Sequence, residues 1–210
     1  MPQISVRGLA KYMAARPAQQ LKVLRDYKFP SPEGTAQAGY YQPARDFIKE
    51  SIRRGQDSEW LLRKAVSLEA QATSAVQQRR TKLLSNASAI RGFAANFGSR
   101  RLVLLDAKRF RLRHGGVTVT VSPELHVTER GEERVILLGM PSIQDDAQTR
   151  VMLQCTADAI EQERLPIRRS SVRYWDCHTG QEVKGTDRRT RLAADIEASC
   201  QTIDAIWPTI

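Results

Sequence analysis

The spacing of the apolar residues changes at Ser99, and this change constrains the fold more than any other feature of the chain. Before it, apolar side chains recur at every third or fourth position, as in residues 44–52, which is the pattern of a helix with one buried face. After it, valines alternate with threonines from Val117 to Val121, the two-residue period of a strand. The chain is therefore expected to fold as an α/β (α+β) protein.

Turn and cap residues divide both halves into elements. Pro17 suits the first position of a helix, Asp57 or Ser58 suits a helix cap, and Gly98 suits a helix end. The proline- and glycine-rich segment from Lys28 to Gly39 predicts a loop, and His114-Gly115-Gly116 predicts a hairpin turn. Helices are expected as two short pieces within residues 6–28 and at 40–54, 57–68, 75–97, 147–162 and 189–206; strands are expected at 102–105, 110–114, 117–121, 125–127, 135–138 and 172–175.

These elements predict a helical N-terminal region packed on a small, mostly antiparallel or mixed sheet with flanking helices. From about residue 75 the order is α-β-β-β-α-β-α. Two regions are expected: a helical basic region at 1–98 and an α/β region at 99–210, which forms one compact unit with the helix at 75–97.

The positive charge is concentrated in the first half of the chain. Lysines and arginines number 16 against 7 aspartates and glutamates up to Ser99, and 17 against 16 from Arg100 onward, within a net charge of +10. An excess of one sign in one region is typical of a surface that meets a polyanion. The alternative is a basic surface that serves only solubility.

Clusters of basic residues predict where phosphates would bind, because the arginine fork grips phosphate oxygens. On a strand, alternate arginines share a face at a spacing of about 6–7 Å, which can follow a phosphate backbone. The alternative for such a stripe is a sheet edge protected by charge against pairing. The predicted nucleic-acid-binding residues are Arg53, Arg54, Arg79, Arg80, Lys82, Arg100, Arg101, Arg109, Arg111 and Arg113.

The element order and one short motif resemble the PD-(D/E)XK phosphodiesterase superfamily, which includes many nucleases. Ser122-Pro123-Glu124 stands where the first motif of that family belongs, with glutamate for aspartate. The resemblance covers about residues 75–176 and implies a divalent metal held by carboxylates. However, the strand at 135–140 has neither the acid nor the lysine of the second motif. The implied active site is degenerate, and Glu124 is its only catalytic candidate; the alternative is an exposed carboxylate at the start of a strand.

A second Asp-x-Lys pattern occurs at Asp106 and Lys108, directly before the arginines at 109, 111 and 113. No Pro-Asp pair precedes it at a suitable distance. We interpret it as the junction of a loop and a strand with a basic edge.

Other features limit the class of protein. No apolar run approaches the ~20 residues that span a bilayer, so no membrane partner is expected. The three cysteines are far apart and form no zinc spacing with the histidines, which predicts reduced thiols and a cytoplasmic location. No metal site or cofactor is expected, except Mg²⁺ if the chain is a nuclease.

Three functions remain open at this point. The preferred one is non-catalytic binding of DNA or RNA phosphates through a basic face, as an accessory subunit in DNA metabolism or phage defence. The second is a metal-dependent nuclease with a non-standard site at Glu124. The third is an adaptor that binds an acidic protein partner in a bacterial complex.

Overall fold

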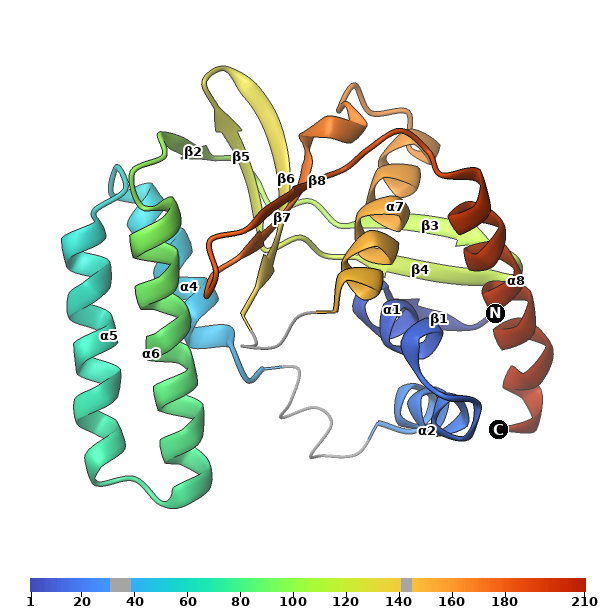
Figure 1. The fold of residues 1–210 in the computed structure, drawn as a ribbon, viewed down its shortest axis with the longest axis horizontal. Coiled ribbons are helices and arrows are strands. Elements are labelled where there is room, and N and C mark those ends of the chain that lie inside the picture. The colour runs from blue at the N-terminus through green and yellow to red at the C-terminus, as the bar shows by residue number, and fades with distance from the viewer. Residues whose placement is uncertain (31–38, 141–144) are drawn as a thin grey trace.

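The computed structural model describes residues 1–30, 39–140 and 145–210. Helices and strands are both present, and the predicted α+β class is confirmed (Figure 1). Most of the predicted loop at Lys28–Gly39 lies outside the described residues.

The N-terminal region is helical, as the apolar spacing predicted. Pro17 occupies the first position of its helix, and the Asp57 side chain accepts a hydrogen bond from the backbone N–H of Trp60, which confirms both start signals. A short strand that the sequence did not reveal precedes the helices. The elements are β1 (Gln3–Ser5), α1 (Val6–Ala14), α2 (Pro17–Lys28), α4 (Gln42–Arg53), α5 (Ser58–Thr73) and α6 (Gln77–Phe97).

The C-terminal region alternates strands and helices. Gly115 and Gly116 both have positive φ, 49° and 78°, as a two-residue hairpin turn requires. The Asp145 side chain caps the helix that follows it. The elements are β2 (Leu102–Leu104), β3 (Phe110–His114), β4 (Val117–Val121), β5 (Leu125–Glu129), β6 (Glu132–Gly139), α7 (Asp146–Gln162), β7 (Val172–Asp176), β8 (Glu182–Lys184) and α8 (Thr190–Ile206).

The strands form two mixed sheets rather than one. The smaller has the order β1-β4-β3, with β1 parallel to β4. The larger has the order β2-β5-β6-β7-β8, in which only β6 and β7 are parallel. The sequence did not reveal this division because each strand alternates in the same way whichever sheet it joins.

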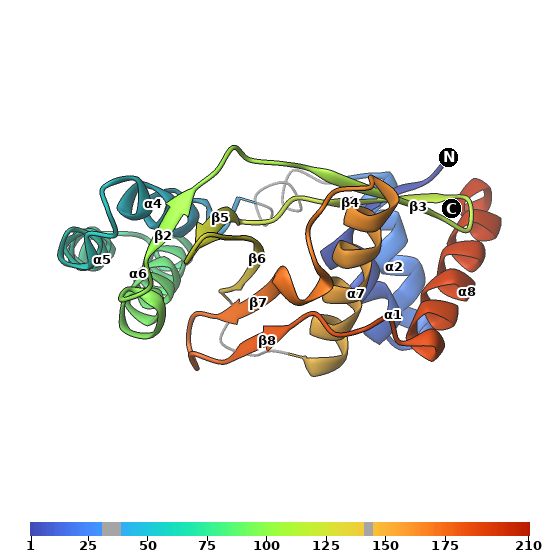
Figure 2. The same ribbon diagram turned by 90° about the horizontal axis from the view of Figure 1, so that it is seen from above.

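The five-stranded sheet lies between two apolar cores. Val135 and Leu137 of β6 face the core that contains α7, which we call the α7 core. Ile136 and Leu138 face the core that contains α6, which we call the α6 core, as the two-residue period of a strand requires. The α7 core includes buried residues of α1, α2, α7, α8 and the small sheet. The α6 core includes buried residues of α4, α5 and α6, and these helices lie together on one side of the large sheet (Figure 2). Each core contains residues that come before residue 98 in the sequence and residues that come after it.

Two further findings bear on the sequence predictions. None of the helices in the described ranges is both long and apolar enough to cross a bilayer. Cys155, Cys177 and Cys200 are buried and form no disulfide. Burial raises the pKa of the Cys200 thiol to about 11, so this thiol is protonated at neutral pH.

Candidate nucleic-acid interface

The ten predicted phosphate-binding residues lie in four separate places. Arg79, Arg80 and Lys82 are in the first turns of α6, at the end of the α5–α6 hairpin that is remote from β2 (Figure 1). A helix rises about 1.5 Å per residue, so roughly 30 Å separates this end of α6 from Arg100. One short stretch of nucleic acid bound at Arg100 therefore does not reach the tip of the hairpin.

Arg109, Arg111 and Arg113 lie on or beside β3, the outer strand of the small sheet. All three are exposed, while Phe110 and Leu112 between them are buried. The backbone N–H groups of Arg111 and Arg113 donate to the side chains of Glu163 and Gln162. This strand edge is therefore already covered by polar side chains from the end of α7 and the residue that follows it.

Arg53 and Arg54 end α4 close to the junction of α6 and β2. Gln56, which follows α4, binds to both sides of this junction. Its side chain donates to the carbonyl of Phe97 and accepts from the backbone N–H of Leu102. Both arginines pair with Glu50, and the Arg54 guanidinium lies 4.9 Å from the ring centre of Trp60. Their charges are thus partly balanced within the helical region.

The fourth place, which contains Arg100 and Arg101, is a charged area on the same face of the large sheet that covers the α6 core. Strand register explains its position. Arg134 of β6 lies two residues before Ile136, and Arg173 of β7 lies two residues before Trp175, so each arginine shares a face with a buried apolar side chain. Arg173 lies opposite Lys184 of β8 in the register of the two strands. This face of the sheet is therefore apolar along most of the strands and charged at one end.

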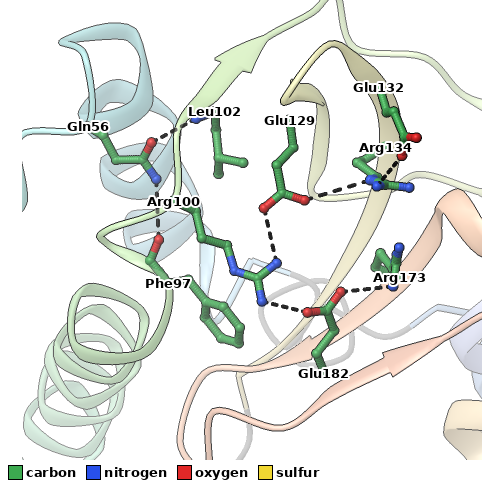
Figure 3. A network of polar contacts seen from close by, with 9 residues as sticks. All are labelled: Gln56, Phe97, Arg100, Leu102, Glu129, Glu132, Arg134, Arg173 and Glu182. Carbon is green, nitrogen blue, oxygen red and sulfur yellow. Dashed lines mark hydrogen bonds and ion pairs between the residues drawn. The ribbon is translucent and has the colours of Figure 1, made fainter.

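Ion pairs order the arginines at this end of the sheet (Figure 3). Arg100 lies 3.1 Å from Glu129 and 2.5 Å from Glu182, and its guanidinium lies 4.6 Å from the ring centre of Trp175. Glu182 also lies 3.1 Å from Nη1 of Arg173. Burial opposes ionisation of Glu182, but the hydrogen bond and charge of Arg100 and the charge of Arg173 together lower its pKa below the ordinary value. This carboxylate is therefore ionised at neutral pH.

These residues line a pocket of about 680 Å³, which we call the arginine pocket. Six of its lining side chains are cationic and two are anionic, so an excess of four positive charges faces the space. Arg101, Arg130 and Lys184 are exposed, whereas the Arg173 side chain is only 9% exposed. The lining residues are Ser99, Arg100, Arg101, Glu129, Arg130, Arg134, Arg173, Glu182 and Lys184.

Two arginines of the pocket are largely buried. Nε of Arg134 and both Nε and Nη1 of Arg173 are enclosed by the protein and have no hydrogen-bond partner in the described part of the chain. Nη1 of Arg173 lies 3.1 Å from Glu182 and Nε of Arg134 lies 3.7 Å from Glu129, as ion pairs without hydrogen-bond geometry. Burial lowers the pKa of Arg173, and the charges of Arg134 and Arg100 lower it further, so that it stays below the ordinary value despite Glu182. The surplus of positive charge around Arg173 therefore opposes its ionisation, and an anion in the pocket would offset that surplus.

Glu124 has a different environment, and the expectation of an exposed carboxylate is wrong. It is 6% exposed. The Nη2 atom of Arg7 lies 3.0 Å from both carboxylate oxygens of Glu124, and the backbone N–H of Leu138 donates to Oε2. Arg45 lies 3.5 Å away as an ion pair. Glu124 is buried because these groups replace its water, and it thereby connects α1, α4 and β6.

Both motifs that resembled nuclease motifs meet at one small pocket. Asp106 and Glu124 line a space of about 240 Å³ together with His126, whose ring lies between the carbonyl of Asp106 and the carboxylate of Glu133. Within the described ranges, no group of three or more His, Cys, Asp or Glu is arranged to hold a metal ion. The groups that contact the Glu124 carboxylate are guanidinium groups and a backbone amide.

Sequence reasoning identified Arg100 and Arg101 but missed the other residues of the arginine pocket. The missed residues are Glu129, Arg130, Arg134, Arg173, Glu182 and Lys184. A signal was present for two of them, because Arg134 and Arg173 fall in phase with the buried apolar residues of their strands. A charged residue in phase with buried apolar residues lies either at the end of a strand or in a polar cluster. The sequence does not show which strands bring Arg134 and Arg173 together.

Comparison of the chain with protein-family models and with curated proteins found no match.

Proposed function

We propose that this protein binds nucleic acid without catalysis and that the arginine pocket is where it grips phosphate. The observation that carries the proposal is the surplus of positive charge in the pocket, where six cationic side chains and two carboxylates line a space of about 680 Å³. Phosphate oxygens are the acceptors that arginine donors match best.

Two further features support this proposal. The exposed cations at the pocket, Arg101, Arg130 and Lys184, can contact neighbouring phosphates of the same strand. Arg130 is held at this position by a tight turn, in which both Arg130 and Gly131 have positive φ, 53° and 81°. The turn between β5 and β6 therefore forms one side of the pocket.

The test is fluorescence anisotropy with labelled single-stranded DNA, duplex DNA and RNA over a range of salt concentrations. Each neutralised phosphate contributes about −0.9 to the slope of log affinity against log salt for duplex DNA. We expect Arg101→Glu to weaken binding and to reduce this slope. Arg79→Glu is the matched control, because its distance of roughly 30 Å exceeds the Debye length of about 10 Å.

Absence of binding at low salt would contradict the proposal. An equal loss in the Arg101→Glu and Arg79→Glu variants would place the interface on the α5–α6 hairpin instead. Loss in the control alone would lead to the same conclusion.

A further inference from the structure

A second basic area adjoins the arginine pocket at the edge of the large sheet. Strand β8 is the edge strand, and its residue Lys184 lines both the arginine pocket and a smaller pocket of about 230 Å³. The smaller pocket is also lined by Val183, which packs against the α7 core. Because neighbouring residues of a strand point to opposite faces, the two pockets lie on opposite faces of the sheet and meet at β8.

The smaller pocket continues into a cleft between α1, α7 and α8. This cleft has a volume of about 340 Å³, and Arg150 and Arg189 line both spaces. The connection from β8 to α8 is attached to α7 at this point, since the backbone N–H of Arg189 donates to the side chain of Gln154 at 3.4 Å. Shared lining residues therefore join the arginine pocket, the smaller pocket and the cleft into one path around β8, which we call the edge path.

The cations of the edge path are available to an external anion. Arg150, Arg189 and Arg191 are exposed, and none of their guanidinium groups has an ion-pair partner among the residues that the structure describes. One carboxylate, that of Asp195, lines the cleft beside them. The excess of positive charge thus extends from the arginine pocket onto the α7 face of the sheet.

The shape of the edge path favours a flexible polyanion. A ligand that contacts cations on both faces must turn around a single edge strand. Duplex DNA has a persistence length of about 50 nm and does not turn within such a distance without a costly kink. A single strand of nucleic acid can make this turn because its backbone is not held in a helix.

The chemistry of the cleft favours the same ligand. Its cations lie beside a group of apolar side chains, which are those of Ala10, Met13, Ala14, Val151 and Leu192. A single strand presents unpaired bases as well as phosphates, and the face of a base can pack on apolar side chains. In a duplex the bases are stacked and paired, so their faces cannot enter the cleft.

We propose that a single strand of nucleic acid follows the edge path from the arginine pocket to the cleft between α1, α7 and α8. Arg150, Arg189 and Arg191 contact its phosphates, and an unpaired base packs in the cleft. This inference rests on the proposed function, because it adds the form of the nucleic acid and a second area of contact.

The experiment compares one internally labelled DNA strand, free of self-complementary segments, with the duplex that it forms with its complement. Affinity is measured by fluorescence anisotropy at low salt. We expect the single strand to bind about tenfold more tightly or better, since it alone gains the charge-assisted contacts of the edge path. Unlabelled single-stranded DNA should displace it, and poly-glutamate should displace it much less.

Three variants with the same change of charge locate the contact. Arg150→Glu and Arg191→Glu, both at exposed positions, should weaken binding of the single strand about tenfold and leave duplex binding within about twofold. Arg101→Glu should weaken both forms, because a duplex still reaches the arginine pocket. Arg79→Glu, at the tip of the α5–α6 hairpin, should change neither. Circular dichroism confirms that each variant is folded.

The outcomes separate this inference from the proposed function. Equal affinity for single strand and duplex would overturn the edge path and leave nucleic-acid binding intact. The same conclusion follows if folded Arg150→Glu and Arg191→Glu both keep the preference, or if they weaken both forms equally. Displacement by poly-glutamate as effective as that by DNA would show attraction to any polyanion and overturn the inference. Absence of binding to either form would overturn both proposals.

Discussion

Two clusters of arginine and glutamate adjoin the large sheet, and they differ in how far positive charge exceeds negative charge. At Glu124, one buried carboxylate accepts from Arg7 and Leu138 and forms an ion pair with Arg45, so its acceptor capacity is used within the chain. The arginine pocket instead has six cationic side chains against two carboxylates, and three of the cations are exposed. The first cluster connects elements of the fold, and the surplus of positive charge in the second supports the proposed binding of an anion.

The comparison shows that burial of charge alone does not identify a binding site. Both clusters contain a charged side chain that is less than a tenth exposed. What separates them is the surplus of positive charge, which is two guanidinium groups against one carboxylate at Glu124 and six cations against two carboxylates in the arginine pocket. Glu124 is the only catalytic candidate in the sequence, whereas this surplus of charge draws attention to the arginine pocket.

The largest expected effect is on stability at Glu124. Glu124→Ala leaves the guanidinium groups of Arg7 and Arg45 without their carboxylate, and breaking a buried ion pair costs about 3 kcal/mol. Urea unfolding monitored by circular dichroism measures the loss. Glu124→Gln, which retains an acceptor oxygen, should cost less. An unchanged free energy of unfolding in Glu124→Ala would show that this cluster does not hold α1, α4 and β6 together.

The same variants address the nuclease alternative. We expect the wild-type protein to leave plasmid DNA intact in the presence of Mg²⁺ or Mn²⁺. Cleavage by the wild-type protein that is lost in a folded Glu124→Gln variant would contradict the non-catalytic proposal and establish Glu124 as part of an active site.

The second expected effect depends on pH and concerns Glu182. Its pKa is lowered in the folded state, so its ion pairs stabilise the protein above the unfolded pKa of about 4.3, and this contribution is lost as pH falls through the lower folded pKa. Glu182→Gln should therefore be less stable than wild type by about 1–2 kcal/mol at neutral pH. Unfolding curves measured down to about pH 3 should show the two proteins converging. A difference that stays constant across this range would exclude the charge of Glu182 as its cause.

The smallest expected effect on stability is at Arg173. Arg173→Met removes a guanidinium that is desolvated and incompletely bonded, and Glu182 keeps its pair with Arg100. Removal of the desolvation penalty of Arg173 offsets the lost attraction to Glu182, so the change should be within about 1 kcal/mol. The same variant should lose affinity for nucleic acid by about tenfold or more. A large loss of stability would make Arg173 a structural residue like Glu124 and remove the contrast between the clusters.

Much of the fold follows from local patterns, because helix caps, hairpin glycines and apolar periods act within a few residues. The helix starts at Pro17 and after Asp57, the Gly115-Gly116 turn and the strand at Val117–Val121 are all present where the sequence predicts them. The short strands β1 and β8 were not predicted, since three residues carry too little periodicity to distinguish a strand from a loop.

The candidate site was predicted only in part. Arg100 and Arg101 were found because they are adjacent in the sequence, whereas Arg134, Arg173 and Lys184 come from strands that meet only through sheet pairing. Neighbouring basic residues predict local charge density, but they contain no information on which distant residue supplies the counter-charge.

By itself, the sequence determined the α+β class, the positions of most helices and strands, and the excess of positive charge. These properties depend on residue type and local spacing, which the chain carries from end to end. The tertiary structure decided that the strands form two sheets, that Glu124 is enclosed by arginines, and that Arg134 and Arg173 meet Arg100 at one pocket. Those outcomes depend on strand register and burial, which arise only when residues far apart in the chain come into contact.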